Sequence, residues 1–307
     1  MINLFNINNY KVDTSQFNNH LHGSIVQDFE KSFAKYVGAK YACSVSSATN
    51  AIFLVFEGTQ EKVIIPSMLP PVVNNALLKA GCSIEYEDNV EWVGDSYKLH
   101  EFTNYKVIDS AQKVKKNQFK IEANSEDLMI FSFYPTKPVG SMDGGIIVSD
   151  DYDKIKYYKE ATINGMSFSK NNWERKIKFP GWKMYMNSFQ AFIALQNLKK
   201  LESKMYVLNA LRKKYNKALG YENTSDHLYR INVQNQNNAI EIMKEDKITC
   251  GIHYAANHLN PVYSFSNKYF LPKTESESKT TLSIPYNEKL TELQADHIIS
   301  VVKNKLR

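Results

Sequence analysis

Apolar positions along the chain recur with two different spacings. Within residues 24–37, the side chains of Ile25, Phe29, Phe33 and Val37 fall on one face of a helix, which Gly38 would end. Short apolar runs without this period lie between such stretches and are typical of buried strands. The helical stretches are 24–38, 47–58 and 70–81, and the strand-like runs are 41–46, 62–66, 106–109, 128–133 and 146–150.

The pattern changes beyond Gly181. Residues 188–219 predict one long helix or two in succession, and a closing helix begins at Thr291, where Gln294 completes a capping-box pattern. Between them the sequence predicts a helix over 237–246 and strands over 228–233, 248–254 and 280–286.

The alternation of strands and helices predicts an α/β fold. Strands separated by helices pair in parallel, so we expect a mostly parallel sheet covered on both faces. The sequence thus divides into a large α/β domain over residues 1–200 and a smaller α+β domain over residues 201–307.

Composition narrows the class of protein. The chain has 307 residues, 43% of them hydrophobic and 23% charged, as in ordinary soluble proteins. The N-terminus lacks a signal-peptide pattern, and no apolar run approaches the ~20 residues of a membrane span. The three scattered cysteines, Cys43, Cys82 and Cys250, favour reduced packing residues in a cytoplasmic protein rather than disulfides or a metal site.

The net charge of +6 comes mainly from lysines. Because the lysines are spread along predicted helices and arginines are few, nucleic acid is not an expected partner. An anionic small molecule remains compatible with this charge.

Polar side chains follow three of the predicted strands. Ligands of α/β sheets bind beyond the carboxyl ends of the strands. Residues 46–50, SSATN, would offer backbone N–H groups at a helix start to a phosphate, although simple N-capping explains them equally. Asp109, with Gln112 one turn on, could hold a protonated ring nitrogen, or could simply cap the next turn.

The third strand end carries Ser132 and then Lys137. Pro135 and Pro138 flank the lysine and restrict the backbone of its turn. A lysine amine whose pKa is lowered by desolvation or by a nearby cation can form a Schiff base with an aldehyde. An exposed lysine in a loop rich in glycine and proline is the alternative.

The three strand ends together favour one cofactor. A phosphate seat, a carboxylate for a ring nitrogen and a lysine that forms an imine are the contacts that pyridoxal 5′-phosphate requires. The sequence therefore predicts a site for pyridoxal 5′-phosphate.

At these residues the chain resembles the DegT/DnrJ/EryC1/StrS family of nucleotide-sugar aminotransferases, which have the aspartate aminotransferase-like (type I) fold. The resemblance covers nearly the whole chain. It is most specific in the segments SSATNAI, VIDSAQ and FSFYPTKPVGSMDGG, and extends to PGWKMYMNSFQAFIALQNLKKL and GIHY.

The resemblance implies a role for each matching residue. Lys137 would form the Schiff base and then move protons, Asp109 would pair with the pyridine nitrogen, and Gln112 would bond near the phenolic oxygen. The phosphate would be held by Ser132, Ala48, Thr49 and Asn50.

Other implied roles concern the substrate and a second subunit. Lys183 stands where the family reaches the phosphate of a neighbouring subunit, so the resemblance implies a homodimer with shared active sites. His253 and Tyr254 would lie near the sugar, although a His-Tyr pair at a strand end is more often a packing feature.

The chain also departs from the family. The segment between Gly81 and the strand at 106–109 is shorter than usual, so we expect a trimmed sheet. Pro70 stands where an aromatic residue usually stacks on the cofactor, so stacking must come from Met68, Leu69 or a residue elsewhere, or cofactor binding is weaker. Tyr185 replaces a common arginine and leaves recognition of the donor carboxylate unexplained.

The resemblance implies that the protein moves an amino group from an amino acid, glutamate by analogy, to a nucleotide-linked keto-deoxy sugar. One alternative is an inactive regulatory or scaffold protein that kept the fold. Another is a sugar dehydratase of the same family, but that branch has histidine where Lys137 stands. The nucleotide, the sugar, the ring carbon and the pathway are not predictable from these residues.

Overall fold

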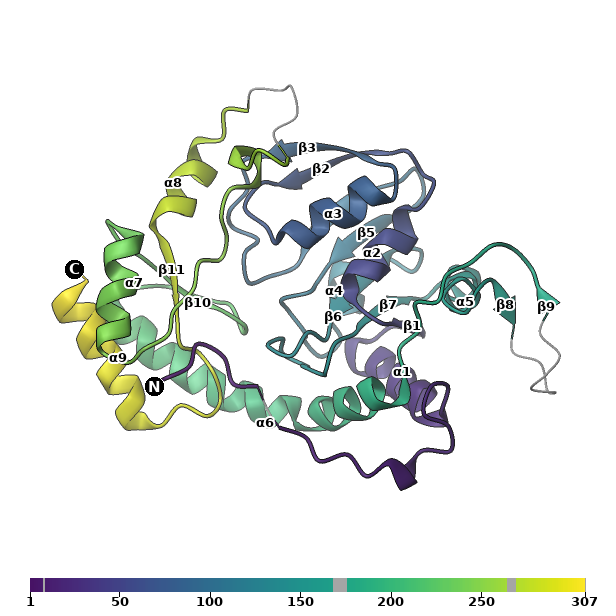
Figure 1. The fold of residues 1–307 in the computed structure, drawn as a ribbon, viewed down its shortest axis with the longest axis horizontal. Coiled ribbons are helices and arrows are strands. Elements are labelled where there is room, and N and C mark those ends of the chain that lie inside the picture. Colours follow the sequence, from purple (N-terminus) through teal and green to yellow (C-terminus); the bar gives the residue numbers. More distant parts are fainter. Residues whose placement is uncertain (8, 168–175, 264–268, 307) are drawn as a thin grey trace.

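The computed structural model describes residues 1–7, 9–167, 176–263 and 269–306. Figure 1 shows a central α/β body from which one long helix leads to a group of C-terminal elements. The helices are α1 (Ser24–Val37), α2 (Ala48–Phe56), α3 (Pro71–Lys79), α4 (Gln118–Glu122), α5 (Tyr152–Ala161), α6 (Ser188–Leu219), α7 (Gln236–Glu245), α8 (Pro272–Thr280) and α9 (Glu292–Lys305). The strands are β1 (Tyr41–Val45), β2 (Lys62–Pro66), β3 (Ser83–Glu87), β4 (Tyr97–Glu101), β5 (Lys106–Asp109), β6 (Leu128–Ser132), β7 (Gly145–Ser149), β8 (Met166–Ser167), β9 (Lys176–Ile177), β10 (Tyr229–Asn232) and β11 (Thr281–Ile284).

The ends of the helices agree with the local sequence. Helix α1 ends at Gly38, which adopts the left-handed conformation with φ of 86°. The side chain of Ser47 caps α2 by accepting a hydrogen bond from the Asn50 N–H. Helix α9 begins with the predicted capping box of Thr291 and Gln294.

The main sheet is mixed, so the expectation of mostly parallel pairing is wrong. Its strand order is β1-β7-β6-β5-β4, and within it only β5 and β6 pair in parallel. A parallel connection requires a crossover of about a dozen residues, usually through a helix. Strands β4 and β5 are joined only by residues 102–105, and β6 and β7 by a loop without a described helix, so both pairs turn back on themselves.

Strands β1, β5 and β6 nevertheless run in the same direction. Strand β7 is antiparallel to both β1 and β6, and β5 is parallel to β6. Their carboxyl ends, Val45, Asp109 and Ser132, therefore lie at one edge of the sheet. In the register, Gly145 is the partner of both Val45 and Ser132.

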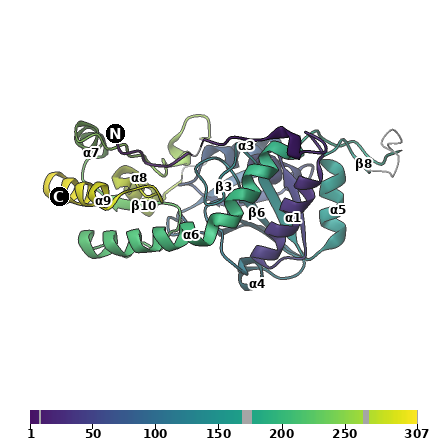
Figure 2. The same ribbon diagram turned by 90° about the horizontal axis from the view of Figure 1, so that it is seen from below.

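Helices cover both faces of this sheet, as predicted. Alternating residues of β6 point to opposite faces, so Leu128 and Ile130 belong to the hydrophobic cluster with α2 and α3. Met129 and Phe131 belong to a second cluster with α1 and α6. Figure 2 shows these two helices side by side over the other face of the sheet. Strands β2 and β3 form a separate parallel pair.

The C-terminal elements enclose a third hydrophobic cluster. Helices α7 and α9 and the antiparallel pair β10–β11 pack around the second half of α6 (Figure 1). Helix α6 passes residue 200 as one continuous helix, so the division into two domains there stays a prediction. The chain start joins this cluster through a bridge between Ile2 and Ile248.

The strand predicted over residues 248–254 is wrong. Ile248 and Gly251 make only isolated bridges, the second with Ser283 of β11. The N–H of Thr249 donates to the carbonyl of Ile2 at 2.9 Å. Because the partners of this segment change from residue to residue, no continuous ladder forms.

The three cysteines are free, as expected. Within the described part of the chain, none of the helices has both the length and the apolar composition required to cross a membrane.

Candidate functional site

The loop that carries Lys137 connects β6 to β7 and is held from both sides. The Lys137 N–H donates to the carbonyl of Tyr134 at 2.8 Å, which closes a tight turn. The backbone of Gly140 lies so close to that of Pro135 that a Cβ at position 140 would stand 2.4 Å from the Pro135 carbonyl oxygen. From α6, the Lys204 Nζ donates to the Pro138 carbonyl at 3.2 Å. The loop is thus fixed by backbone contacts and by α6.

Lys137 is partly buried at this edge of the sheet. Burial lowers the pKa of its amine to about 8, while the charge of Asp109 acts in the opposite direction. Burial lowers the pKa of His253 to about 4 and the pKa of His227 well below its usual value, and the positive charge of Lys137 adds to both shifts. Two histidines that are neutral at pH 7 therefore lie near the lysine.

Asp109 is held in place by two donors. Its Oδ1 accepts from the Ala111 N–H at 2.9 Å, and its Oδ2 accepts from the Tyr97 hydroxyl at 3.0 Å. Burial raises the pKa of this carboxyl, and both donors and the charge of Lys137 oppose that shift. Because a carboxylate has about four lone-pair positions, each oxygen can still accept a further hydrogen bond.

Gln112 joins three parts of the site. Its Oε1 accepts from the Gly94 N–H at 2.8 Å, and its Nε2 donates to the Tyr254 hydroxyl at 3.0 Å. The ring of Tyr254 lies parallel to that of Trp92, with 6.3 Å between the centroids. The predicted residues Gln112 and Tyr254 are therefore brought together, although they are far apart in the sequence.

The start of α2 lies beside the lysine loop. Asn50 Nδ2 donates to Ser46 Oγ at 2.9 Å, which orders the residues before the helix. A Cβ at Gly145 would stand 2.5 Å from the Ala48 nitrogen, so only glycine lets β7 approach the helix start this closely. Ser132, the partner of Gly145 in the register, is buried. This arrangement brings the predicted phosphate residues of α2 and β6 to one place.

His253 lies on the same side of the site. Its Nδ1 shares a hydrogen bond with Ser283 Oγ at 2.8 Å, and its ring contacts those of Phe5 and Tyr254 edge-on. Phe5 also stacks on His227. Residues from the chain start and from the C-terminal elements thus form one wall of the site.

Two expectations receive no support from these contacts. Lys183 is exposed, and its described backbone partner is Ile163, outside the group around Lys137. The prediction that Met68 or Leu69 stacks on the cofactor ring is wrong, because both side chains are fully buried in the hydrophobic cluster under α2 and α3. Pro70 is the neighbouring residue that stays partly exposed.

Tyr97, Trp92 and Gly94 are contact residues that the sequence analysis did not predict. All three lie in the segment between β3 and β5. The register of the β4–β5 hairpin, which pairs Tyr97 with Asp109, is the signal that could have found the tyrosine. The residue type alone, an apolar or aromatic residue in a polar segment, is not sufficient to predict a contact with the site.

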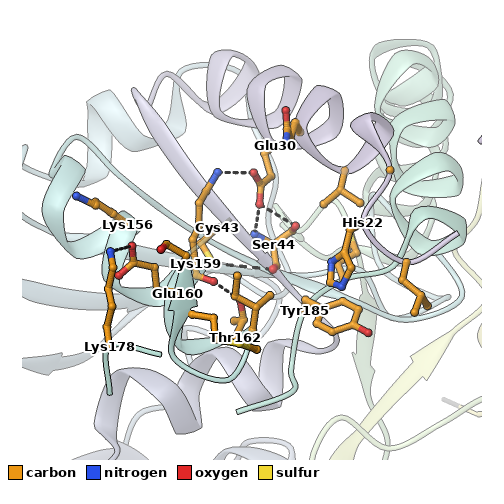
Figure 3. A pocket seen from close by; sticks show the side chains of 18 residues that line it. His22, Glu30, Cys43, Ser44, Lys156, Lys159, Glu160, Thr162, Lys178 and Tyr185 are labelled. Atoms are coloured by element: carbon orange, nitrogen blue, oxygen red, sulfur yellow. Dashed lines mark hydrogen bonds and ion pairs between the residues drawn. The ribbon is translucent and has the colours of Figure 1, made fainter. Parts of the chain in front are cut away.

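A separate pocket of about 590 Å³ lies between α1, β1 and α5. Figure 3 shows its labelled side chains, among them Glu30, which accepts from the backbone and hydroxyl of Ser44 at 2.8 and 2.9 Å. Lys159 pairs with the same carboxylate at 2.5 Å. Tyr185 also lines this pocket and packs against His22. None of the predicted cofactor residues lines it, so the pocket is distinct from the site around Lys137.

The residues around Lys137 fit pyridoxal 5′-phosphate. An amine of lowered pKa, a buried carboxylate with free acceptor positions and a helix start that Gly145 approaches closely meet at one edge of the sheet. The fold and this site define an aspartate aminotransferase-like enzyme of fold type I. Comparison with the aminotransferase TlmJ from Streptoalloteichus hindustanus supports this fold, with a TM-score of 0.83 at 19% identity over 99% of this chain and 98% of that chain.

The chain belongs to the DegT/DnrJ/EryC1/StrS aminotransferase family, whose model matches residues 6–88 and 109–303. It is 25% identical to UDP-4-amino-4,6-dideoxy-N-acetyl-beta-L-altrosamine transaminase of Campylobacter jejuni, over 87% of this chain and 86% of that protein. It is 24% identical to the spore coat polysaccharide biosynthesis protein SpsC of Bacillus subtilis, over 92% and 90% of the two chains.

Family membership confirms several expectations. The protein is an aminotransferase, and pyridoxal 5′-phosphate is its cofactor. Residues 89–108 fall outside the family match, and the shortening of the segment before β5 stays a prediction.

Proposed function

We propose that this protein transfers an amino group from an amino acid, glutamate by family analogy, to a nucleotide-linked keto-deoxy sugar. The observation that carries this proposal is Lys137, partly buried at one sheet edge and within reach of the charge of Asp109. The sugar is supported by the names of two relatives, an altrosamine transaminase and a spore coat polysaccharide biosynthesis protein.

The cofactor residues have separate tasks in this proposal. Asp109 would face the ring nitrogen, and Gln112, held by Gly94, would bond near the phenolic oxygen. The start of α2, at Ala48, Thr49 and Asn50, together with Ser132, would hold the phosphate through N–H and hydroxyl groups. When bound, the cofactor supplies a carbonyl for the incoming amine and an electron sink for the carbon that loses its proton.

Lys137 would act as the acid and base. With its pKa lowered to about 8, a useful fraction of the amine is neutral near pH 7. The Nζ atom would take the proton from the donor carbon that carries the amine and later return a proton to the sugar carbon. His253, on which the charge of Lys137 acts, and Tyr254, which accepts from Gln112, would contact the sugar.

The assembly is part of the same proposal. Lys183 is exposed, and strands β8 and β9 lie beyond α5, away from the main sheet (Figure 1). An exposed lysine on this side is consistent with a homodimer in which it reaches the partner's phosphate site. The free cysteines agree with a cytoplasmic location. Light scattering in solution should give the mass of a dimer, and a monomer at working concentration would contradict the shared site.

The activity is tested by supplying glutamate and a panel of nucleotide keto-sugars and by identifying the product by mass spectrometry. We expect an amino sugar from at least one member, no turnover with Lys137→Ala, and normal turnover with the surface control Lys213→Ala. Bound cofactor without any product would favour the inactive regulatory protein. Release of ammonia without an amino sugar would favour a dehydratase.

A further inference from the structure

The segment outside the family match supplies direct contacts to the site. Residues 89–108 contain β4, which forms a hairpin with β5 instead of a parallel crossover. In the register of this hairpin, Tyr97 is the partner of Asp109. Side chains of directly opposed residues project from the same face of a sheet and lie within contact distance. The hairpin therefore presents a phenol to the carboxylate expected to face the ring nitrogen.

The contact between the two side chains is buried and directional. The Tyr97 hydroxyl donates to Asp109 Oδ2 at 3.0 Å, and the two residues are only 8% and 5% exposed. Burial and the charge of Asp109 raise the pKa of Tyr97, so its phenol stays protonated and remains a donor. Trp92 packs against the phenol ring with 4.6 Å between centroids and limits its movement.

The other charged and titratable groups around Asp109 are few among the described residues. Lys137 acts on Asp109 from the lysine loop, and the charge of Asp109 adds to the burial that raises the pKa of Tyr254 in the segment after α7. Glu87, at the end of β3, acts on Tyr97. The ammonium of Lys137 is lost when the amine becomes neutral, whereas the Tyr97 donor persists.

We propose that Tyr97 is a positioning residue that keeps Asp109 ionised and oriented toward the cofactor ring nitrogen. This inference rests on the proposed cofactor site. A hydrogen bond to a charged acceptor is stronger than one between neutral groups, so it favours the carboxylate over the carboxylic acid. Tyr97 thereby opposes the shift by which burial raises the pKa of Asp109. The β4–β5 hairpin thus supports the site directly through this contact.

The inference is tested first without cofactor. In protein with ¹³C-labelled aspartate carboxyls, NMR titration follows Asp109, and Asp109→Asn assigns its signal. Loss of the charge-assisted hydrogen bond in Tyr97→Phe should raise the pKa of Asp109 by about one pH unit. Tyr215→Phe is the matched control, because Tyr215 is also buried and donates to the Pro285 carbonyl at 3.1 Å. The control should leave the pKa of Asp109 unchanged.

The second measurement is the dissociation constant of pyridoxal 5′-phosphate across pH 5–9. In Tyr97→Phe the pH below which affinity falls should move up by about one unit, with affinity weakened about tenfold below that point. An unchanged pKa of Asp109 in folded Tyr97→Phe, or an equal change in Tyr215→Phe, would overturn the inference. If the wild-type protein failed to bind pyridoxal 5′-phosphate, the proposed function would fail instead, while the titration would still decide whether Tyr97 keeps Asp109 ionised.

Discussion

The lowered pKa of Lys137 predicts the pH dependence of covalent cofactor attachment. Only the neutral amine attacks the carbonyl of pyridoxal 5′-phosphate. Since burial brings the pKa to about 8, the attachment rate should rise up to about pH 8 and then level off. An ordinary lysine, with a pKa of 10.5, would give a rate that keeps rising through pH 10.

The size of the effect follows from the two pKa values. At pH 7, about 9% of an amine with a pKa of 8 is neutral, against about 0.03% for a pKa of 10.5. The reactive form is therefore about 300-fold more abundant in the folded protein. His253, with a pKa of about 4, is neutral throughout this range and should not shape the profile.

The assay mixes cofactor-free protein with pyridoxal 5′-phosphate between pH 6 and 10 and follows the visible absorbance of the attached cofactor. Rates with Nα-acetyllysine over the same range correct for titration of the cofactor itself. Asp109→Asn removes the charge that stabilises the ammonium, so the midpoint should move to lower pH by about one unit. A rate profile with its midpoint near pH 10.5, or a midpoint that Asp109→Asn moves to higher pH, would show that burial near Asp109 does not set the pKa of Lys137.

Two further substitutions test the supports of the site. Gly145→Ala places a Cβ 2.5 Å from the Ala48 nitrogen and should displace the start of α2. In a fluorescence titration, cofactor binding should weaken at least about tenfold. Unchanged affinity would exclude a phosphate site at the start of α2. Asn257→Ala removes two hydrogen bonds, to the carbonyls of Ser67 at 2.9 Å and Leu69 at 2.7 Å. It should lower the free energy of unfolding by about 2 kcal/mol in urea titrations, and a loss below about 0.5 kcal/mol would show that this contact does not hold the loop.

Features of the site that depend on neighbouring residues were predictable from the sequence. Ser47 caps α2 because a serine precedes an apolar helical stretch, and Asp109 ends β5 because a polar residue follows a buried run. The lysine loop was recognisable because Pro135 and Pro138 surround Lys137 between two apolar strands. In each case the physical cause lies within a few residues of the feature.

Features that depend on distant partners were not predictable in this way. Met68 and Leu69 are buried in the cluster under α2 and α3, and Asn257 bonds the backbone of their loop from about 190 residues away, a contact that no local pattern reveals. The short turn between β4 and β5 makes the two strands antiparallel. The mixed pairing in the sheet and the contact of Tyr97 with Asp109 both depend on this turn. The strand signal of residues 248–254 failed because its partners are single residues on separate segments.

The most direct test of the account is to identify the lysine that carries the cofactor. Protein loaded with pyridoxal 5′-phosphate is reduced with borohydride, digested and analysed by mass spectrometry. We expect the peptide containing Lys137 to gain the mass of the reduced cofactor and the peptide containing Lys183 to keep its unmodified mass. A Lys137 peptide at its unmodified mass, or a label on another lysine, would show that Lys137 does not carry the cofactor.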